Sequence, residues 1–140
     1  KWHQIMMAYE GGGHAYHATM PTDALRDFRD TMKETQAYGF EKLKEAQWAL
    51  GGAVRRMLAD KGVTSVAADG FGAPGVVVSY TADPDIQPGK RFAAQGMQIA
   101  AGVPLQCDEP ADIRTIRIGL YGLDGDGTVA RLRRVGDQVL

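Results

Sequence analysis

Few side chains in this sequence combine a type and a position that could do chemistry, and Arg117 is the clearest of them. Residues alternate from Ile113 to Leu120, which sends apolar side chains to one face of an expected strand and Arg117 to the other. A guanidinium group can hold a carboxylate through two parallel hydrogen bonds. From its residue type alone, however, Arg117 is more simply interpreted as an ordinary solvated arginine on an exposed sheet face.

The other candidate side chains do not complete a site. His14 and His17 lie three residues apart in a glycine-rich segment, but no cysteine or carboxylate completes a tetrahedral set, so we expect no metal and assign neither histidine a role. Cys107 has an acidic neighbour, which disfavours the thiolate that a catalytic cysteine needs. The stretch 124–128 is similar to a calcium loop but has Val135 where a bidentate glutamate is required.

The hydrophobic pattern predicts the elements that must position these residues. After a loop with one short helix over 1–20, a helix is expected from about Thr22 to Gln36, followed by a long amphipathic helix from Gly39 to near Gly62. Two antiparallel strands over 63–67 and 76–80 follow, joined by a glycine- and proline-containing turn.

The second half of the chain continues this mixture of helices and strands. We expect a helix from Pro84 towards Gly96, short strands over 97–102 and 113–120, and a last helix capped by Thr128. The predicted fold class is therefore α+β, with a small, mostly antiparallel sheet of three to four strands packed against helices and preceded by two N-terminal helices. A boundary near Gly39 would divide 1–38 from 39–140.

Composition narrows the class of protein. A length of 140 residues, 44% hydrophobic and 24% charged, is typical of one soluble globular domain. The net charge of -1, with basic residues scattered among acidic ones, gives no reason to expect nucleic acid, and no apolar run approaches the roughly 18 residues that cross a membrane. A single cysteine favours a cytoplasmic location. Because the chain opens on Lys1, we expect a fragment of a longer protein.

Three segments together resemble the small-domain region of the class V pyridoxal-phosphate (PLP) aminotransferases. They are Tyr16–Pro21, Ala73–Tyr80 and Ile116–Leu120, and their order and spacing match over nearly all of the chain. The resemblance is closest to the alanine-glyoxylate/serine-pyruvate branch. It implies the C-terminal domain of the fold-type I PLP transferases, with 39–140 as the small domain and 1–38 as a loop and helix at the interface with an absent large domain.

The same resemblance implies roles for individual residues. Arg117 matches the arginine that holds the substrate carboxylate, while Tyr16 and Thr19 match residues that hydrogen-bond the PLP phosphate of the neighbouring subunit in a homodimer. Hydroxyl groups are suited to phosphate oxygens. The lysine that forms the Schiff base in this family would lie upstream, and none of the six lysines here sits in its context. The isolated chain is therefore expected to be inactive and to hold no catalytic residue.

The parent protein is expected to be an enzyme that transfers an amino group between alanine or serine and glyoxylate or pyruvate, with PLP as its cofactor. Two alternatives stay open. The chain could be a stand-alone α+β binding or interaction module, in which the matching segments carry only the fold. It could also belong to a PLP lyase or desulfurase of the same fold.

Overall fold

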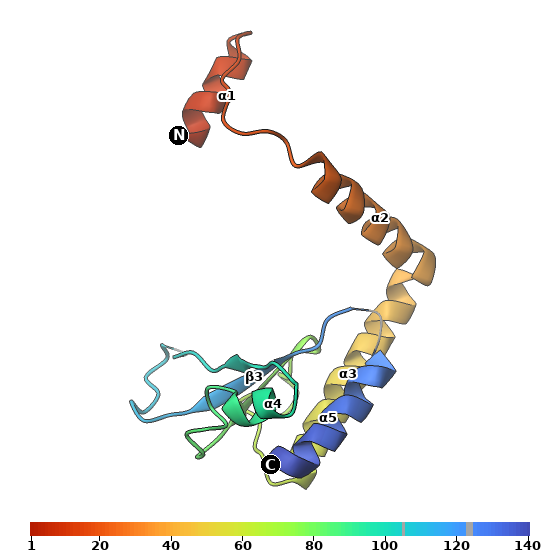
Figure 1. Ribbon diagram of the computed structural model, residues 1–140, viewed down its shortest axis with the longest axis vertical. Coiled ribbons are helices and arrows are strands. Elements are labelled where there is room, and N and C mark those ends of the chain that lie inside the picture. The colour runs from red at the N-terminus through yellow and green to blue at the C-terminus, as the bar shows by residue number, and fades with distance from the viewer. Residues whose placement is uncertain (105, 123–124) are drawn as a thin grey trace. The chain divides into compact units, whose positions relative to one another are not determined.

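The computed structural model describes residues 1–104, 106–122 and 125–140, with the backbone alone for Gly125 and Asp126. The chain divides into two compact units, Lys1–Tyr38 and Gly39–Leu140, and each is considered by itself (Figure 1). Within the described ranges, no helix is long and apolar enough to cross a membrane.

The first unit consists of helix α1 (Trp2–Glu10), a loop, and helix α2 (Thr22–Tyr38). Helix α1 ends at a turn in which Gly12 adopts a φ of 77°, a conformation that glycine reaches without steric cost. Helix α2 begins directly after Pro21 and carries Asp23 in its first turn, where a negative charge complements the helix dipole. The predicted start of α2 is thus correct, and the helix continues past its expected end at Gln36.

The first unit exposes a stripe of apolar side chains. Neither α1 nor α2 contains a buried residue. On α2, Leu25, Phe28 and Met32 lie three and four residues apart, and their exposed fractions are 49%, 65% and 56%. Residues at this spacing share one helix face, and in most proteins that face is buried. The first unit therefore carries an apolar stripe on α2 that the unit itself does not bury.

The second unit is built around a three-stranded antiparallel sheet in the order β1-β3-β2. Strand β3 (Thr115–Gly119) lies in the centre, between β1 (Val76–Tyr80) and the short β2 (Ala100–Ala101). The small antiparallel sheet among helices confirms the predicted α+β class.

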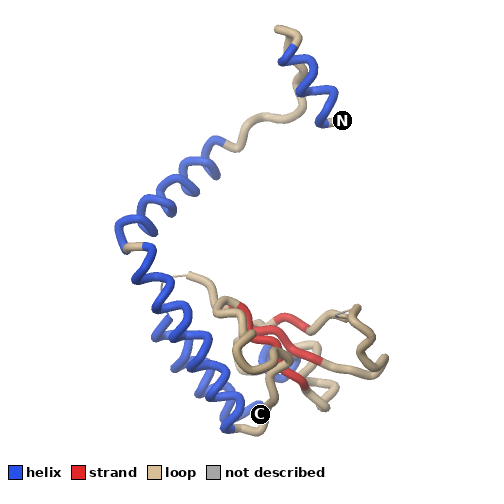
Figure 2. Tube along the Cα trace, turned by 180° about the vertical axis from the view of Figure 1, so that it is seen from behind, coloured by secondary structure: helices blue, strands red, loops and turns tan. Residues whose placement is uncertain are grey.

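Helices cover one face of this sheet. Figure 2 shows α3 (Phe40–Asp60) and α5 (Gly125–Val139) side by side next to the strands, and the short α4 (Lys90–Ala94) also contacts α5. The alternation predicted for β3 is confirmed, because Ile116 and Ile118 are buried against the helices. Burial of an aliphatic side chain of this size stabilises a fold by about 1.5–3 kcal/mol. The main buried side chains of this core are Val54, Leu58, Val77, Phe92, Ile116, Ile118, Leu120, Leu132 and Val135.

The strand predicted over 63–67 is wrong in extent, although its antiparallel direction is right. Only Ser65 bridges Ser79 of β1, flanked by hydrogen bonds from Val66 N–H to the Val78 carbonyl and from Tyr80 N–H to the Thr64 carbonyl. The pairing goes no further because Ala67 N–H bonds to the Ser65 hydroxyl at 3.2 Å, a local bond that competes with a ladder.

Three further elements differ in their bounds from the prediction. The helix expected from Pro84 towards Gly96 is reduced to α4, because Pro88 is followed by Gly89 with a φ of 80°, which interrupts helical geometry. The strand expected over 97–102 is reduced to the two residues of β2. Helix α5 begins at Gly125, so Thr128 lies inside the helix and is not its N-cap.

Candidate functional site

Arg117 lies at the centre of the sheet, on the face opposite to the core. It is directly paired with Val78 on β1 and with Ala100 on β2, so a small or medium apolar side chain stands on either side of it. The adjacent residues of β3, Ile116 and Ile118, point the other way into the core. This position fixes the base of the arginine while its tip remains on the open face, as the alternation predicted.

The Arg117 guanidinium is held at one of its nitrogens. Its Nε–H donates to the carbonyl oxygen of Ala101 at 2.9 Å. No carboxylate among the described residues forms an ion pair with Arg117. With Nε–H engaged, the two terminal nitrogens present the parallel N–H pair that binds a carboxylate in the bidentate manner. The fold therefore fixes the orientation of this guanidinium through its Nε–H group.

The ring of Tyr121 fills the space beside Gly119, which lies two residues after Arg117 on β3. A Cβ built on Gly119 would lie 2.8 Å from the ring carbon Cε2 of Tyr121, and one built on Gly75 would lie 3.6 Å from Cε1 of the same ring. The Tyr121 ring therefore rests over two glycines, and its side chain is 78% exposed. Sequence reasoning missed this residue because it follows the end of the alternating pattern.

Tyr16 and Thr19 are brought together in the loop of the first unit. The Tyr16 hydroxyl lies 3.1 Å from Thr19 Oγ1, within hydrogen-bonding distance, and both residues are exposed. Each hydroxyl group has one proton, so both groups can donate to the oxygens of a phosphate only when the hydrogen bond between them opens. The pair and Arg117 belong to different units, and each is described within its own unit.

The two histidines of the loop behave differently from each other. The ring of His17 meets the ring of Trp2 edge-on, with centroids 4.6 Å apart and an angle of 76° between the planes. His14 is exposed. Among the described residues, no three histidine, cysteine, aspartate or glutamate side chains gather closely enough to hold a metal ion. His17 thus has a packing role in the first unit, next to the Tyr16–Thr19 pair.

Comparison with known proteins identifies the fold. No protein-family model and no curated protein matches the chain. Among solved structures, the chain is similar to the aspartate aminotransferase of subgroup IV from Thermus thermophilus, with a TM-score of 0.69 and 19% sequence identity. The match covers 99% of this chain and 39% of that enzyme. The chain therefore has the fold of part of an aminotransferase and spans well under half of that enzyme's length.

Proposed function

We propose that this chain is the C-terminal part of a PLP-dependent aminotransferase and that it supplies the site for the substrate carboxylate. The observation that carries the proposal is Arg117, an arginine held at the centre of the open sheet face in a chain with an aminotransferase fold. The motifs around Tyr16 and Arg117 favour class V and its alanine-glyoxylate/serine-pyruvate branch. Alanine or serine, with glyoxylate or pyruvate, is the proposed substrate set.

The proposed mechanism assigns orientation to Arg117. The carboxylate is the one charged group that every α-amino acid shares with its 2-oxo acid, so a fixed guanidinium can hold both substrate and product in one geometry. The hydrogen bond from Arg117 Nε–H to the Ala101 carbonyl holds the guanidinium plane in one orientation. Val78 and Ala100 flank it with apolar surface, which strengthens its attraction for an anion relative to open water.

PLP, when bound, supplies the electron sink that makes the Cα–H bond of the substrate acidic. Within this chain, Tyr16 and Thr19 would donate from their hydroxyl groups to the PLP phosphate of the neighbouring subunit. The residues that complete the cofactor site would come from the rest of the parent protein and from the partner subunit of a homodimer. We therefore propose that the isolated chain is inactive and that 1–38 contacts the remainder of the parent. A cytoplasmic location is proposed from the single cysteine.

The test compares Arg117 with a matched arginine in the complete protein that contains this chain. Hydrogen bonds to charged groups contribute about 1.5–3 kcal/mol each, so Arg117→Ala, which removes both bonds of the guanidinium, should raise the KM for L-alanine by about a hundredfold or more. Arg117→Lys should recover only part of this loss, because lysine keeps the charge without the planar fork. Arg114→Ala removes an exposed charge just before β3, and its KM should stay within about twofold of the parent value.

The same assay separates the alternatives. Transfer of the amino group to glyoxylate or pyruvate, with the expected ranking of the variants, supports the proposal. Ammonia or sulfide released in place of transfer would identify a lyase or desulfurase of the same fold. A complete protein that neither binds PLP nor reacts with amino acids would leave the chain as a binding or interaction module.

A further inference from the structure

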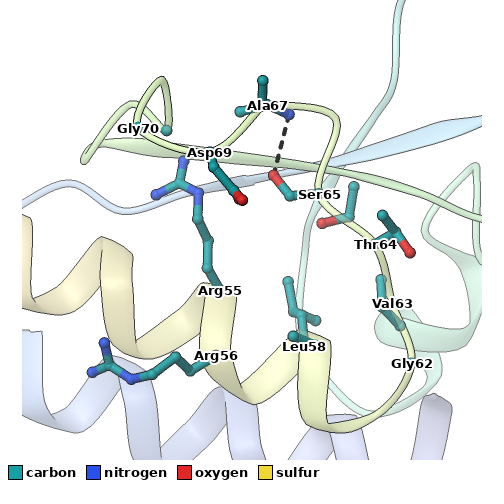
Figure 3. Close-up of a pocket in the computed structure, with 14 residues that line it drawn as sticks. Arg55, Arg56, Leu58, Gly62, Val63, Thr64, Ser65, Ala67, Asp69 and Gly70 are labelled. Carbon is teal, nitrogen blue, oxygen red and sulfur yellow. Dashed lines mark hydrogen bonds between the residues drawn. The ribbon is translucent and has the colours of Figure 1, made fainter.

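A pocket lies on the helix side of the sheet. It has a volume of ≈ 480 Å³, within the range of about 300–1,000 Å³ that small-molecule sites occupy, and it is formed by the C-terminal half of α3 and the segment 62–72. Figure 3 shows Arg55 rising from α3 towards the loop that carries Asp69, while Arg56 points away along the helix. Three charged residues line this pocket, and of these Arg55 and Asp69 lie at the loop, whereas the Arg56 side chain points away from it.

Two buried polar atoms of the pocket lining have no hydrogen-bond partner in the described part of the chain. They are the Arg55 Nε and the hydroxyl oxygen of Ser79, a residue that is 1% exposed. Most buried polar side-chain atoms in proteins are paired, so two unpaired atoms in one lining indicate a polar ligand. Both can donate a hydrogen bond, so they favour a ligand with acceptor oxygens.

The Arg55 side chain is fixed in place by its other contacts. Its Nη2 donates to the carbonyl oxygens of Ala73 at 2.6 Å and Val76 at 3.0 Å. Gly72 lies so close that a Cβ there would be 2.8 Å from the guanidinium carbon and from Nε. The guanidinium is thus pre-organised, which lowers the entropy lost when a ligand binds.

From this geometry we infer that the pocket is a binding site for an α-amino acid with a small apolar side chain. A simple carboxylate would meet the like charge of Asp69, and a simple amine would meet that of Arg55. A zwitterion places its carboxylate against Arg55 and Ser79 and its ammonium group against Asp69. Leu58, which is 1% exposed, and Val63 provide apolar lining for the side chain.

This site is distinct from the one at Arg117 and does not depend on the proposed function. Ser79 pairs with Ile116, which faces the core, whereas the next pair along the ladder joins Val78 to Arg117 on the open face. The two candidate sites therefore lie on opposite faces of the same two strands, and variants can remove one without touching the other.

The experiment is a titration of the 140-residue chain, followed by the backbone amide signals of Ser65, Ala67 and Ser79 in two-dimensional NMR spectra. The probes are L-valine, isovalerate, which lacks the ammonium group, and isobutylamine, which lacks the carboxylate. We expect saturable shifts with L-valine and binding at least about tenfold weaker for each of the other two probes, because each loses a charged contact.

Four variants locate the binding. Ser79→Ala and Asp69→Asn should each weaken L-valine binding by about tenfold or more, whereas Arg114→Ala and Arg117→Ala, which lie outside the pocket lining, should leave it unchanged. Isovalerate binding as tightly as L-valine would overturn the assignment to an amino acid. The site itself would be overturned if L-valine caused no shifts at millimolar concentration, or if the shifts persisted unchanged in Ser79→Ala. Arg55 Nε and the Ser79 hydroxyl would then be bound by water alone.

Discussion

Replacement of Ser79 by alanine should make the protein more stable. Ser79 is 1% exposed, and its hydroxyl has no hydrogen-bond partner among the described residues. A buried polar group without a partner costs about 1–3 kcal/mol, and alanine removes that group while it leaves the strand backbone unchanged. The free energy of unfolding of Ser79→Ala should therefore rise by about 1 kcal/mol or more. For a domain of about 100 residues, this corresponds to roughly 4–8 °C in Tm.

Ser65 provides the matched control, because it bridges Ser79 from the neighbouring segment and carries the same side chain. Its hydroxyl accepts the Ala67 N–H bond at 3.2 Å, so Ser65→Ala should lower stability by about 0.5–1.5 kcal/mol. Urea unfolding of the two variants and the parent, with the midpoint and the slope measured separately, gives the comparison. A Ser79→Ala variant that is less stable than the parent would refute the reasoning and show that its hydroxyl has a partner in solution.

Three further changes test other parts of the account. Gly51→Ala should lower the free energy of unfolding by about 1–3 kcal/mol in the same urea assay, because the new methyl group would lie 2.7 Å from the Pro74 carbonyl oxygen. Lys61→Ala breaks a 2.7 Å ion pair with Asp137 of α5, and the loss should stay below about 1 kcal/mol and shrink at high salt. We expect the exposed apolar stripe of α2 to make the isolated chain self-associate, and Phe28→Asp, which places a charge on that stripe, should reduce this association in sedimentation velocity without changing the Tm of the second unit.

Much of the fold could be predicted where local pattern and tertiary packing agree. The alternation through Ile116 and Ile118 predicts the central strand, and the stripe of α3 predicts the burial of Val54 and Leu58. The same apolar spacing predicts burial of Phe40 as well, but Phe40 is 64% exposed. Hydrophobic spacing identifies the apolar face of a helix, and it does not show how far along the helix the packing partner extends. The bounds of the predicted strand over 63–67 are wrong for a related reason. The residue types there favour pairing with β1, but the Ser65 hydroxyl bonds to Ala67 N–H and competes with that pairing.

The residues of the two candidate sites also differ in how far the sequence alone predicts them. The face on which Arg117 lies could be predicted, because side chains alternate between the two faces along a strand. Arg55 could not, since its partners, the carbonyls of Ala73 and Val76, are 18 and 21 residues away in sequence. Ser79 carried a usable signal, because it is a polar residue on the same face as Val77 in a strand whose other core-facing residues are apolar.

The most direct test of the carboxylate site observes Arg117 itself. The Nε–H group of Arg117 donates to the Ala101 carbonyl, which should slow its exchange with water and make its NMR signal observable. Titration of the 140-residue chain with pyruvate should shift this signal in a saturable manner, while Arg114 in the same spectrum shows only the weak drift of a solvated arginine. If both arginines respond alike, or if neither responds, Arg117 is not a carboxylate site and the proposed function loses the observation that carries it.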